Sequence, residues 1–236
     1  MKKNHSGKPV KISRSKIDLF FQCKRCFWLD LVKDIKRPPS PPFTLNSAVD
    51  QLMKNEMDEY RKKKMPHPLA LKNSLNLIPF DHEKIDDWRQ NSKGIGHLHG
   101  PTGLYIHGSP DEVWVDGNEI LFVVDFKATS KKDTPSLEDG WGPNFKRQVE
   151  VYQWLFKQNS FKVSDKAYFL YSNGIKGNRT FENMLLFESI LLVHEGDTSW
   201  VEGVLLEISE CLKSKNIPEA NPKCQICNYF ESVSKL

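Results

Sequence analysis

The sequence predicts an α/β fold in which helices flank a mixed central β-sheet, and three observations indicate it. Apolar runs flank a Gly-Asn turn between residues 104 and 127, which is typical of a β-hairpin. An apolar stripe at helical spacing follows at 144–159, and strand-like runs occupy 166–172 and 184–193. This order of elements favours an α/β sandwich around a mixed sheet.

The other elements follow from local signals along the chain. Residues 1–11 are basic, and we expect a flexible tail there. A helix is expected over 13–33, where Ser13 or Ser15 can cap its first turn. The remaining expectations are a stiff proline-rich connector at 37–42, a helix at 45–61, an irregular segment at 66–99 with a short helix near 85–89, a polar loop at 130–143 and a helix at 199–213.

Two acids and a lysine lie near the ends of the predicted hairpin strands. With the turn centred on Gly117, paired residue numbers sum to 234, and Asp111 lies opposite Val123. Side chains alternate along a strand, so Asp125 and Lys127 share the face of Val123, and Asp111 joins them from the neighbouring strand. We expect the other face to pack on the core through Ile120, Phe122, Val124 and Phe126.

The predicted proximity of Asp111 and Asp125 points to a metal ion. Two neighbouring carboxylates repel each other and raise a pKa unless a cation lies between them. Mg²⁺ fits this position because it binds one or two carboxylates together with water and substrate phosphate oxygens. Lys127 can then orient or help to deprotonate an attacking water and offset charge in the transition state. The alternative interpretation is an ordinary Asp–Lys pair on a strand surface.

Three short motifs follow one another along the chain: Gly108-Ser-Pro-Asp111, Asp125-Phe-Lys127 and Gln148-Val-Glu-Val-Tyr152. Their order and spacing resemble the PD-(D/E)XK nuclease superfamily, and most closely its RecB-like branch, which includes the CRISPR-associated RecB-like exonucleases. The resemblance covers roughly residues 11–230. It implies a restriction-endonuclease-like core that hydrolyses DNA phosphodiester bonds with Mg²⁺ or Mn²⁺.

The resemblance also implies roles for individual residues. These are metal ligation by Asp111, Asp125 and the Phe126 carbonyl, catalysis by Lys127, and contacts with the substrate strand by Gln148 and Tyr152. Gln148 and Tyr152 are four residues apart and therefore share one face of their helix. The alternative for this pair is a solvent-exposed glutamine and a core tyrosine.

One family element departs from the usual pattern. RecB-like members often carry Gly-x-x-x-His on an upstream helix, with the histidine as a further metal ligand. The helix at 45–61 has Asn46 in place of the glycine and Asp50 in place of the histidine. Hard Mg²⁺ prefers oxygen to imidazole, so we expect Asp50 to be a third ligand. The alternative is an exposed helix acid.

Two C-x-x-C pairs near the ends of the chain form a second candidate site: Cys23-Lys-Arg-Cys26 and Cys224-Gln-Ile-Cys227. Two such pairs commonly supply one four-sulfur site, and the spacing favours zinc. The resemblance implies a 4Fe–4S cluster instead, although the family usually places one cysteine before the core and three after it. We expect the cluster, with zinc as the alternative, as a structural clip between the terminal segments. Cys211 is expected in the core.

The distribution of charge and tryptophan bears on the substrate. The net charge is only +4, but basic residues cluster at 1–16, at Arg61–Lys64 and around Lys131 and Lys132, which suits binding to a phosphate backbone. Trp141, in the polar loop, is a candidate base contact. We therefore expect DNA as the partner, including single-stranded DNA. The resemblance adds a protein partner from a repair, recombination or CRISPR system.

The length of 236 residues with 39% hydrophobic content suffices for one large domain. We expect a single domain over 12–236, with a helical part at 12–100, a catalytic core at 101–195 and a C-terminal helix and C-x-x-C segment at 196–236. No apolar run approaches the roughly 20 residues of a membrane span, and no signal sequence is recognisable, so a cytoplasmic protein is expected. Alternatives to a nuclease are a catalytically inactive nucleic-acid-binding or scaffold subunit and an unrelated zinc-clipped module.

Overall fold

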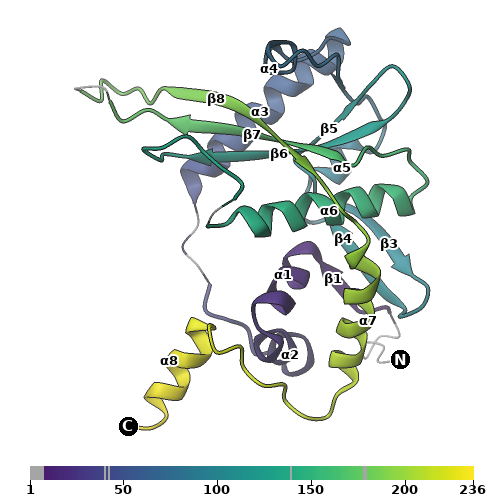
Figure 1. The fold of residues 1–236 in the computed structure, drawn as a ribbon, viewed down its shortest axis with the longest axis vertical. Helices are drawn as coiled ribbons and strands as arrows, with labels where there is room; N and C mark the ends of the chain where they lie inside the picture. Colours follow the sequence, from purple (N-terminus) through teal and green to yellow (C-terminus); the bar gives the residue numbers. More distant parts are fainter. Residues whose placement is uncertain (1–7, 40, 42, 139, 178–179) are drawn as a thin grey trace. The chain divides into compact units, whose positions relative to one another are not determined.

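The structure is a computed structural model that describes residues 8–39, 41, 43–138, 140–177 and 180–236 (Figure 1). The chain divides into two compact units whose segments interleave along the sequence. Unit 1 comprises Met1–Pro41, Gly96–His107 and Ser199–Leu236, and unit 2 comprises Pro42–Ile95 and Gly108–Thr198. The single domain expected over 12–236 stays a prediction. Most of the expected basic tail, at 1–7, lies outside the described residues.

Unit 2 is built on a mixed sheet with the strand order β2-β5-β6-β7-β8 (Figure 1). Strand β6 pairs in parallel with β7, whereas the other neighbouring strands pair antiparallel. The strands are β2 (Ile78–Pro79), β5 (Glu112–Val115), β6 (Leu121–Thr129), β7 (Lys166–Gly174) and β8 (Phe187–Glu195). The helices are α3 (Thr44–Lys63), α4 (Pro68–Lys72), α5 (Ile85–Trp88) and α6 (Gly142–Gln158). The predicted α/β fold, a mixed sheet flanked by helices, is confirmed.

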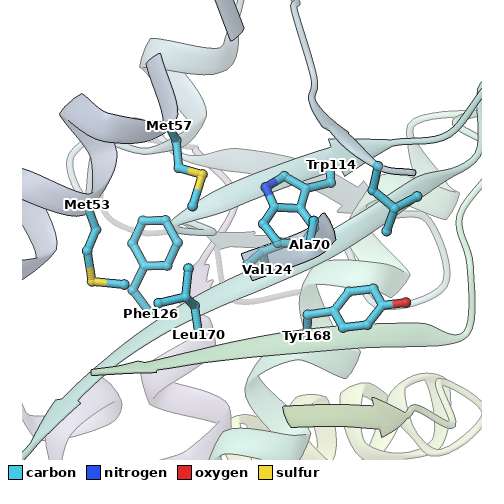
Figure 2. Close-up of a cluster of buried hydrophobic side chains, with 9 residues drawn as sticks. Met53, Met57, Ala70, Trp114, Val124, Phe126, Tyr168 and Leu170 are labelled. Atoms are coloured by element: carbon cyan, nitrogen blue, oxygen red, sulfur yellow. The ribbon is translucent and has the colours of Figure 1, made fainter. Parts of the chain in front are cut away.

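One face of this sheet packs against α3 and α4. Figure 2 shows Met53 and Met57 of α3 together with Phe126, Val124 and Leu170 of the strands, and Ala70 of α4 joins the same cluster. The expected apolar face is therefore confirmed for Val124 and Phe126, whereas Phe122 and Ile120, which precedes β6, are only half-buried. The opposite face of β6 is buried as well, because Val123 and Asp125 are both 0% exposed.

Helix α6 carries the predicted buried stripe. Val149, Tyr152, Leu155 and Phe156 are all buried. The helix begins at Gly142, where an added Cβ would lie 2.0 Å from the Leu137 carbonyl oxygen. Glycine is therefore the residue that allows the preceding loop to pass this close to the first turn.

Unit 1 contains a smaller sheet with the strand order β1-β4-β3. Its strands are β1 (Lys11–Ser13), β3 (Ile95–His99) and β4 (Leu104–Gly108), and β1 pairs in parallel with β4. Its helices are α1 (Arg14–Gln22), α2 (Lys24–Lys33), α7 (Trp200–Lys213) and α8 (Gln225–Val233). Among the described helices, none is both long enough and apolar enough to cross a membrane.

Three expectations about these elements are wrong, and one helix was not expected. The helix expected over 13–33 is interrupted at Cys23, whose extended backbone (φ −165°, ψ 111°) separates α1 from α2. The hairpin expected from residue 104 begins at β5, because β4 belongs to the smaller sheet. The segment expected to be irregular at 66–99 also contains β2, β3 and α4, and α8 was not expected.

Candidate functional site

The β5–β6 hairpin has a different register from the one expected. Glu112 pairs with Val124 and Val113 with Val123, so paired numbers sum to 236. The turn centres on Asn118, because the Asp116 carboxylate accepts hydrogen bonds from the backbone N–H groups of Asn118 and Ile120, both at 2.9 Å. One further step of this register brings Asp111 opposite Asp125 rather than Val123. The residue opposite Asp111 thus shifts by two positions. Because side chains alternate along a strand, a shift of two keeps both acids on the same face.

Asp111 lies just before β5 and is held by the neighbouring strand. Its Oδ2 accepts a hydrogen bond of 2.8 Å from the backbone N–H of Phe126. The side chain is 21% exposed. Burial and the nearby charge of Asp125 raise the pKa of Asp111 to about 6, although the Lys127 and Lys54 ammonium groups pull it downward. The two acids therefore interact electrostatically, as the sequence led us to expect.

Asp125 and Lys127 form the centre of the site. Asp125 is 0% exposed, and its Oδ2 accepts a hydrogen bond from Lys127 Nζ. The other oxygen, Oδ1, is buried and has no hydrogen-bond partner among the described residues. Lys127 Nζ also lies 3.5 Å from the carbonyl oxygen of Phe126. A buried carboxylate oxygen without a partner is costly, and a cation would satisfy it.

Helix α6 contributes three side chains. The ring centroid of Phe145 lies 4.5 Å from Lys127 Nζ, a cation–π contact that the sequence analysis missed. One turn further on, the Gln148 amide donates a hydrogen bond of 3.2 Å to the Tyr152 hydroxyl, so these two side chains share a helical face as expected. Both are buried, which excludes the solvent-exposed alternative for Gln148.

Helix α3 lies beside the same strands. The Asn46 amide donates a hydrogen bond of 3.0 Å to the carbonyl of Ala128, directly after Lys127. Asp50, one turn along, pairs with Lys54 at 2.8 Å, and Lys54 Nζ also lies 3.8 Å from Asp111 Oδ1. Sequence reasoning missed Lys54, although its i,i+4 spacing from Asp50 was visible.

Two arginines surround Glu112, the residue that follows Asp111. The adjacent residue Glu112 is completely buried, and both of its carboxylate oxygens lie 2.6 Å from Arg61 Nη2. Arg89 Nη1 is 3.7 Å from the same carboxylate and 2.8 Å from Asp58. This arrangement corrects one expectation: Arg61 is buried in an ion pair and does not join Lys62–Lys64 in a basic surface for phosphate.

The four paired cysteines converge within unit 1. Sγ–Sγ distances are 3.8 Å for Cys23 and Cys227, 3.7 Å for Cys26 and Cys224, and 3.5 Å for Cys26 and Cys227. All four are buried, and among the described residues they are the only group of three or more His, Cys, Asp or Glu donors within 4.8 Å of one another. A four-cysteine site that joins the terminal segments is therefore confirmed.

Both C-x-x-C pairs have the same local structure. Cys23 and Cys224 precede helices α2 and α8 in extended conformations, and each backbone carbonyl accepts a hydrogen bond of 3.0 Å from the residue four positions on. The second cysteine of each pair then lies in the first helical turn, with its sulfur beside the first. The interruption of the expected 13–33 helix is thus what brings Cys23 and Cys26 together.

Charge around the sulfurs is uneven. Burial raises the pKa of a thiol, but hydrogen bonds from the Asn221 and Cys26 backbone and from neighbouring thiols bring the pKa of Cys23 down to about 7. Burial and neighbouring thiols raise the pKa of Cys227. Arg37 donates to Cys224 Sγ at 3.5 Å and to Gln22 at 2.7 Å, which places one positive charge against the sulfurs.

Two remaining sequence candidates lie elsewhere. Trp141, at the start of α6, is 66% exposed and free to contact a ligand. Cys211 on α7 is half-buried, and burial raises the pKa of its thiol. It is not part of the four-sulfur group.

Comparison with known proteins identifies the family. Residues 11–232 match the PD-(D/E)XK nuclease superfamily, and the chain belongs to it. Membership suggests metal-dependent phosphodiester hydrolysis on a nucleic-acid substrate.

Two solved structures are similar to the chain. One, the crystal structure of SSO0001, has a TM-score of 0.41 and 15% identity over 98% of this chain and 86% of that one. The other, LHK-Exo in complex with dAMP, has a TM-score of 0.41 and 10% identity over 95% of this chain and 92% of that one. No curated protein matches the chain in sequence.

Proposed function

We propose that the chain is a deoxyribonuclease of the RecB-like branch that hydrolyses DNA phosphodiester bonds with Mg²⁺ or Mn²⁺. The observation that carries the proposal is the buried Asp125 carboxylate, whose Oδ1 lacks a hydrogen-bond partner among the described residues beside the second acid Asp111. The resemblance adds a protein partner from a repair, recombination or CRISPR system, and a cytoplasmic location is part of the same proposal.

The donor set fits a hard divalent ion. Asp111, Asp125 and the Phe126 carbonyl supply oxygen atoms, which Mg²⁺ and Mn²⁺ prefer. The Phe126 backbone is engaged on both sides, because its N–H donates to Asp111 and its carbonyl lies near Lys127 Nζ. When bound, the metal ion supplies Lewis acidity toward a phosphate oxygen and toward water.

The protein side chains account for the remaining tasks. Lys127 is held between the Asp125 carboxylate and the Phe145 ring, so its ammonium is positioned to orient water and offset charge on a phosphate. The Gln148–Tyr152 hydrogen bond fixes the Gln148 amide, whose remaining donor and acceptor groups suit contact with a substrate strand.

DNA cleavage tests this proposal. We expect the wild-type chain to cleave single-stranded DNA with Mn²⁺ or Mg²⁺, and Asp125→Asn and Lys127→Met to lose at least a hundredfold in rate. The exposed residues Asp81 and Lys84 offer matched controls, and Asp81→Asn and Lys84→Met should cleave like the wild type. Equal rates in all five proteins would contradict the assignment. Metal-independent DNA binding without cleavage would support the inactive-subunit alternative.

The cysteine site is proposed to hold a structural metal, and its geometry supports zinc. Four sulfurs on one tetrahedral ion with Zn–S bonds of about 2.3 Å lie roughly 3.8 Å apart. The Sγ–Sγ distances of 3.5–3.8 Å match this spacing. A 4Fe–4S cluster places its ligand sulfurs on four separate irons and therefore farther apart. Metal analysis of anaerobically purified protein decides between the two: about one zinc per chain supports this assignment, and four irons with broad visible absorption support the cluster.

A further inference from the structure

Lys54 lies on α3 and contacts two acids, one on its own helix and one at the start of the β5–β6 hairpin. Its Nζ lies 2.8 Å from Asp50 Oδ2 and 3.8 Å from Asp111 Oδ1. The side chain is only 16% exposed, and both carboxylates lie within 4 Å of its ammonium group. Lys127 on β6 pairs with Asp125. Within the described part of the site, two ammonium groups therefore accompany three acids.

The position of Lys54 is fixed by the packing of its helix. Met53 and Met57 point from α3 into the core beside Phe126, as Figure 2 shows. Two turns before Lys54, the Asn46 amide holds the Ala128 carbonyl at 3.0 Å. These contacts lie on both sides of the Asp50–Lys54 turn. The ammonium is therefore held beside Asp111 by the buried Met53 and Met57 and by the Asn46 hydrogen bond, rather than by its ion pairs alone.

This arrangement limits how many metal ions the site can take. Hydrolytic sites with two metal ions hold them about 3.5–4 Å apart, with carboxylates around both. Asp50 and Asp111 would have to supply the second set of ligands here. The Lys54 ammonium already pairs with both of them, 2.8 Å from Asp50 Oδ2 and 3.8 Å from Asp111 Oδ1. A second dication would also meet the Lys54 ammonium at short range, which is unfavourable in a partly buried site.

We propose that Lys54 takes the place of a second metal ion, so that the active site binds a single divalent ion per chain. This inference rests on the proposed function, since it requires Asp111 and Asp125 to hold the first ion. Asp50 then acts as the anchor of Lys54 and not as a ligand of that ion. An ammonium has three donors, and those not used by Asp50 and Asp111 can contact a non-bridging phosphate oxygen.

Counting bound Mn²⁺ tests the inference without measuring cleavage. Electron paramagnetic resonance of free Mn²⁺ gives the stoichiometry for the full chain with its cysteine site loaded. Wild type and Lys54→Arg should bind one ion. Lys54→Met leaves Asp50 and Asp111 without their cation, and it should bind two. The double variant Asp50→Asn with Lys54→Met also lacks the Asp50 carboxylate, and it should bind one ion again.

The outcomes separate this inference from the proposed function. Two ions in the wild type, or one ion in a folded Lys54→Met variant, would overturn the role of Lys54. Lys54→Gln serves as the second neutral variant if Lys54→Met loses its circular dichroism signal. Mn²⁺ binding that is unchanged in Asp125→Asn would instead overturn the proposed function, because the ion would then not be held at this site.

Discussion

Arg61 Nη2 lies 2.6 Å from each carboxylate oxygen of Glu112, and the two form a buried ion pair directly beside Asp111. Glu112 has no exposed surface, so its negative charge is balanced by Arg61 and, at a longer distance, by Arg89. The pair joins α3 to the first residue of β5. The β5–β6 hairpin and the helix that carries Lys54 are therefore joined by this ion pair.

Removal of one partner of this pair should be costly. Arg61→Met leaves the Glu112 carboxylate buried with its closest partner lost, and we expect the free energy of unfolding to fall by about 3–5 kcal/mol. Urea unfolding monitored by tryptophan fluorescence measures the change. Lys62→Met is the matched control, since the exposed Lys62–Glu59 pair should contribute nothing measurable. Equal effects of the two substitutions would show that the buried pair is unimportant.

The pKa of Asp111 predicts a pH dependence in the metal-free protein. In the folded state this pKa is about 6, above the usual 3.8, because burial and Asp125 disfavour the charged form. The folded state therefore binds the proton more tightly than the unfolded state. The wild type should lose stability, relative to Asp111→Asn, as pH rises from about 4 to above 6, by roughly 3 kcal/mol at most.

Thermal unfolding in a chelator across this pH range measures the effect. The difference between wild type and Asp111→Asn should grow with pH and then level off above the folded-state pKa. Addition of Mn²⁺ should remove it, because a bound dication favours the ionised carboxylate. A difference that is constant with pH would show that Asp111 titrates normally.

Loss of one sulfur should release the metal proposed for the cysteine site. We expect Cys26→Ser to lower the metal content of purified protein below half of the wild-type value and to weaken hydrogen-exchange protection in α1, α2 and α8. Cys211→Ser, outside the four-sulfur group, should retain full metal content. The prediction fails if both variants hold the same amount of metal.

An exposed tryptophan should contribute to binding of single strands. Trp141 is 66% exposed at the start of α6, and stacking of a base on an aromatic ring contributes about 1–3 kcal/mol. Trp141→Ala should therefore weaken single-stranded DNA binding about tenfold or more. Tyr229, also 66% exposed but located in unit 1, gives the control variant Tyr229→Ala, which should bind like the wild type. Fluorescence anisotropy at fixed salt measures both.

The sequence predicted which side chains of the candidate site share a face better than it predicted the register and boundaries of the surrounding elements. The alternation of side chains along β6 placed Asp125 and Lys127 on one face. The expected register was wrong by two residues, and because side chains alternate with a period of two, Asp111 still lies on that face. The register itself depended on Asp116, whose side chain accepts two backbone hydrogen bonds in the turn. A Gly-Asn pair suggested a shorter turn than the one that these bonds produce.

Other features depend on tertiary contacts that local patterns do not report. The break at Cys23 has no glycine or proline to mark it, and it is fixed by convergence on residues about two hundred positions away. Arg61 looked like part of a basic run, yet its burial follows from Glu112 on a distant strand. Phe145 carried no signal, because its role arises only when α6 packs over Lys127.

Cys26 and Cys227 stand 201 positions apart, yet their sulfurs lie 3.5 Å from each other. During synthesis, about two hundred further residues must follow the first pair of thiols before its partners exist. A chain truncated before Cys224 offers only half of the donors. A metal ion held by all four sulfurs would therefore be bound only after Cys227 has been made.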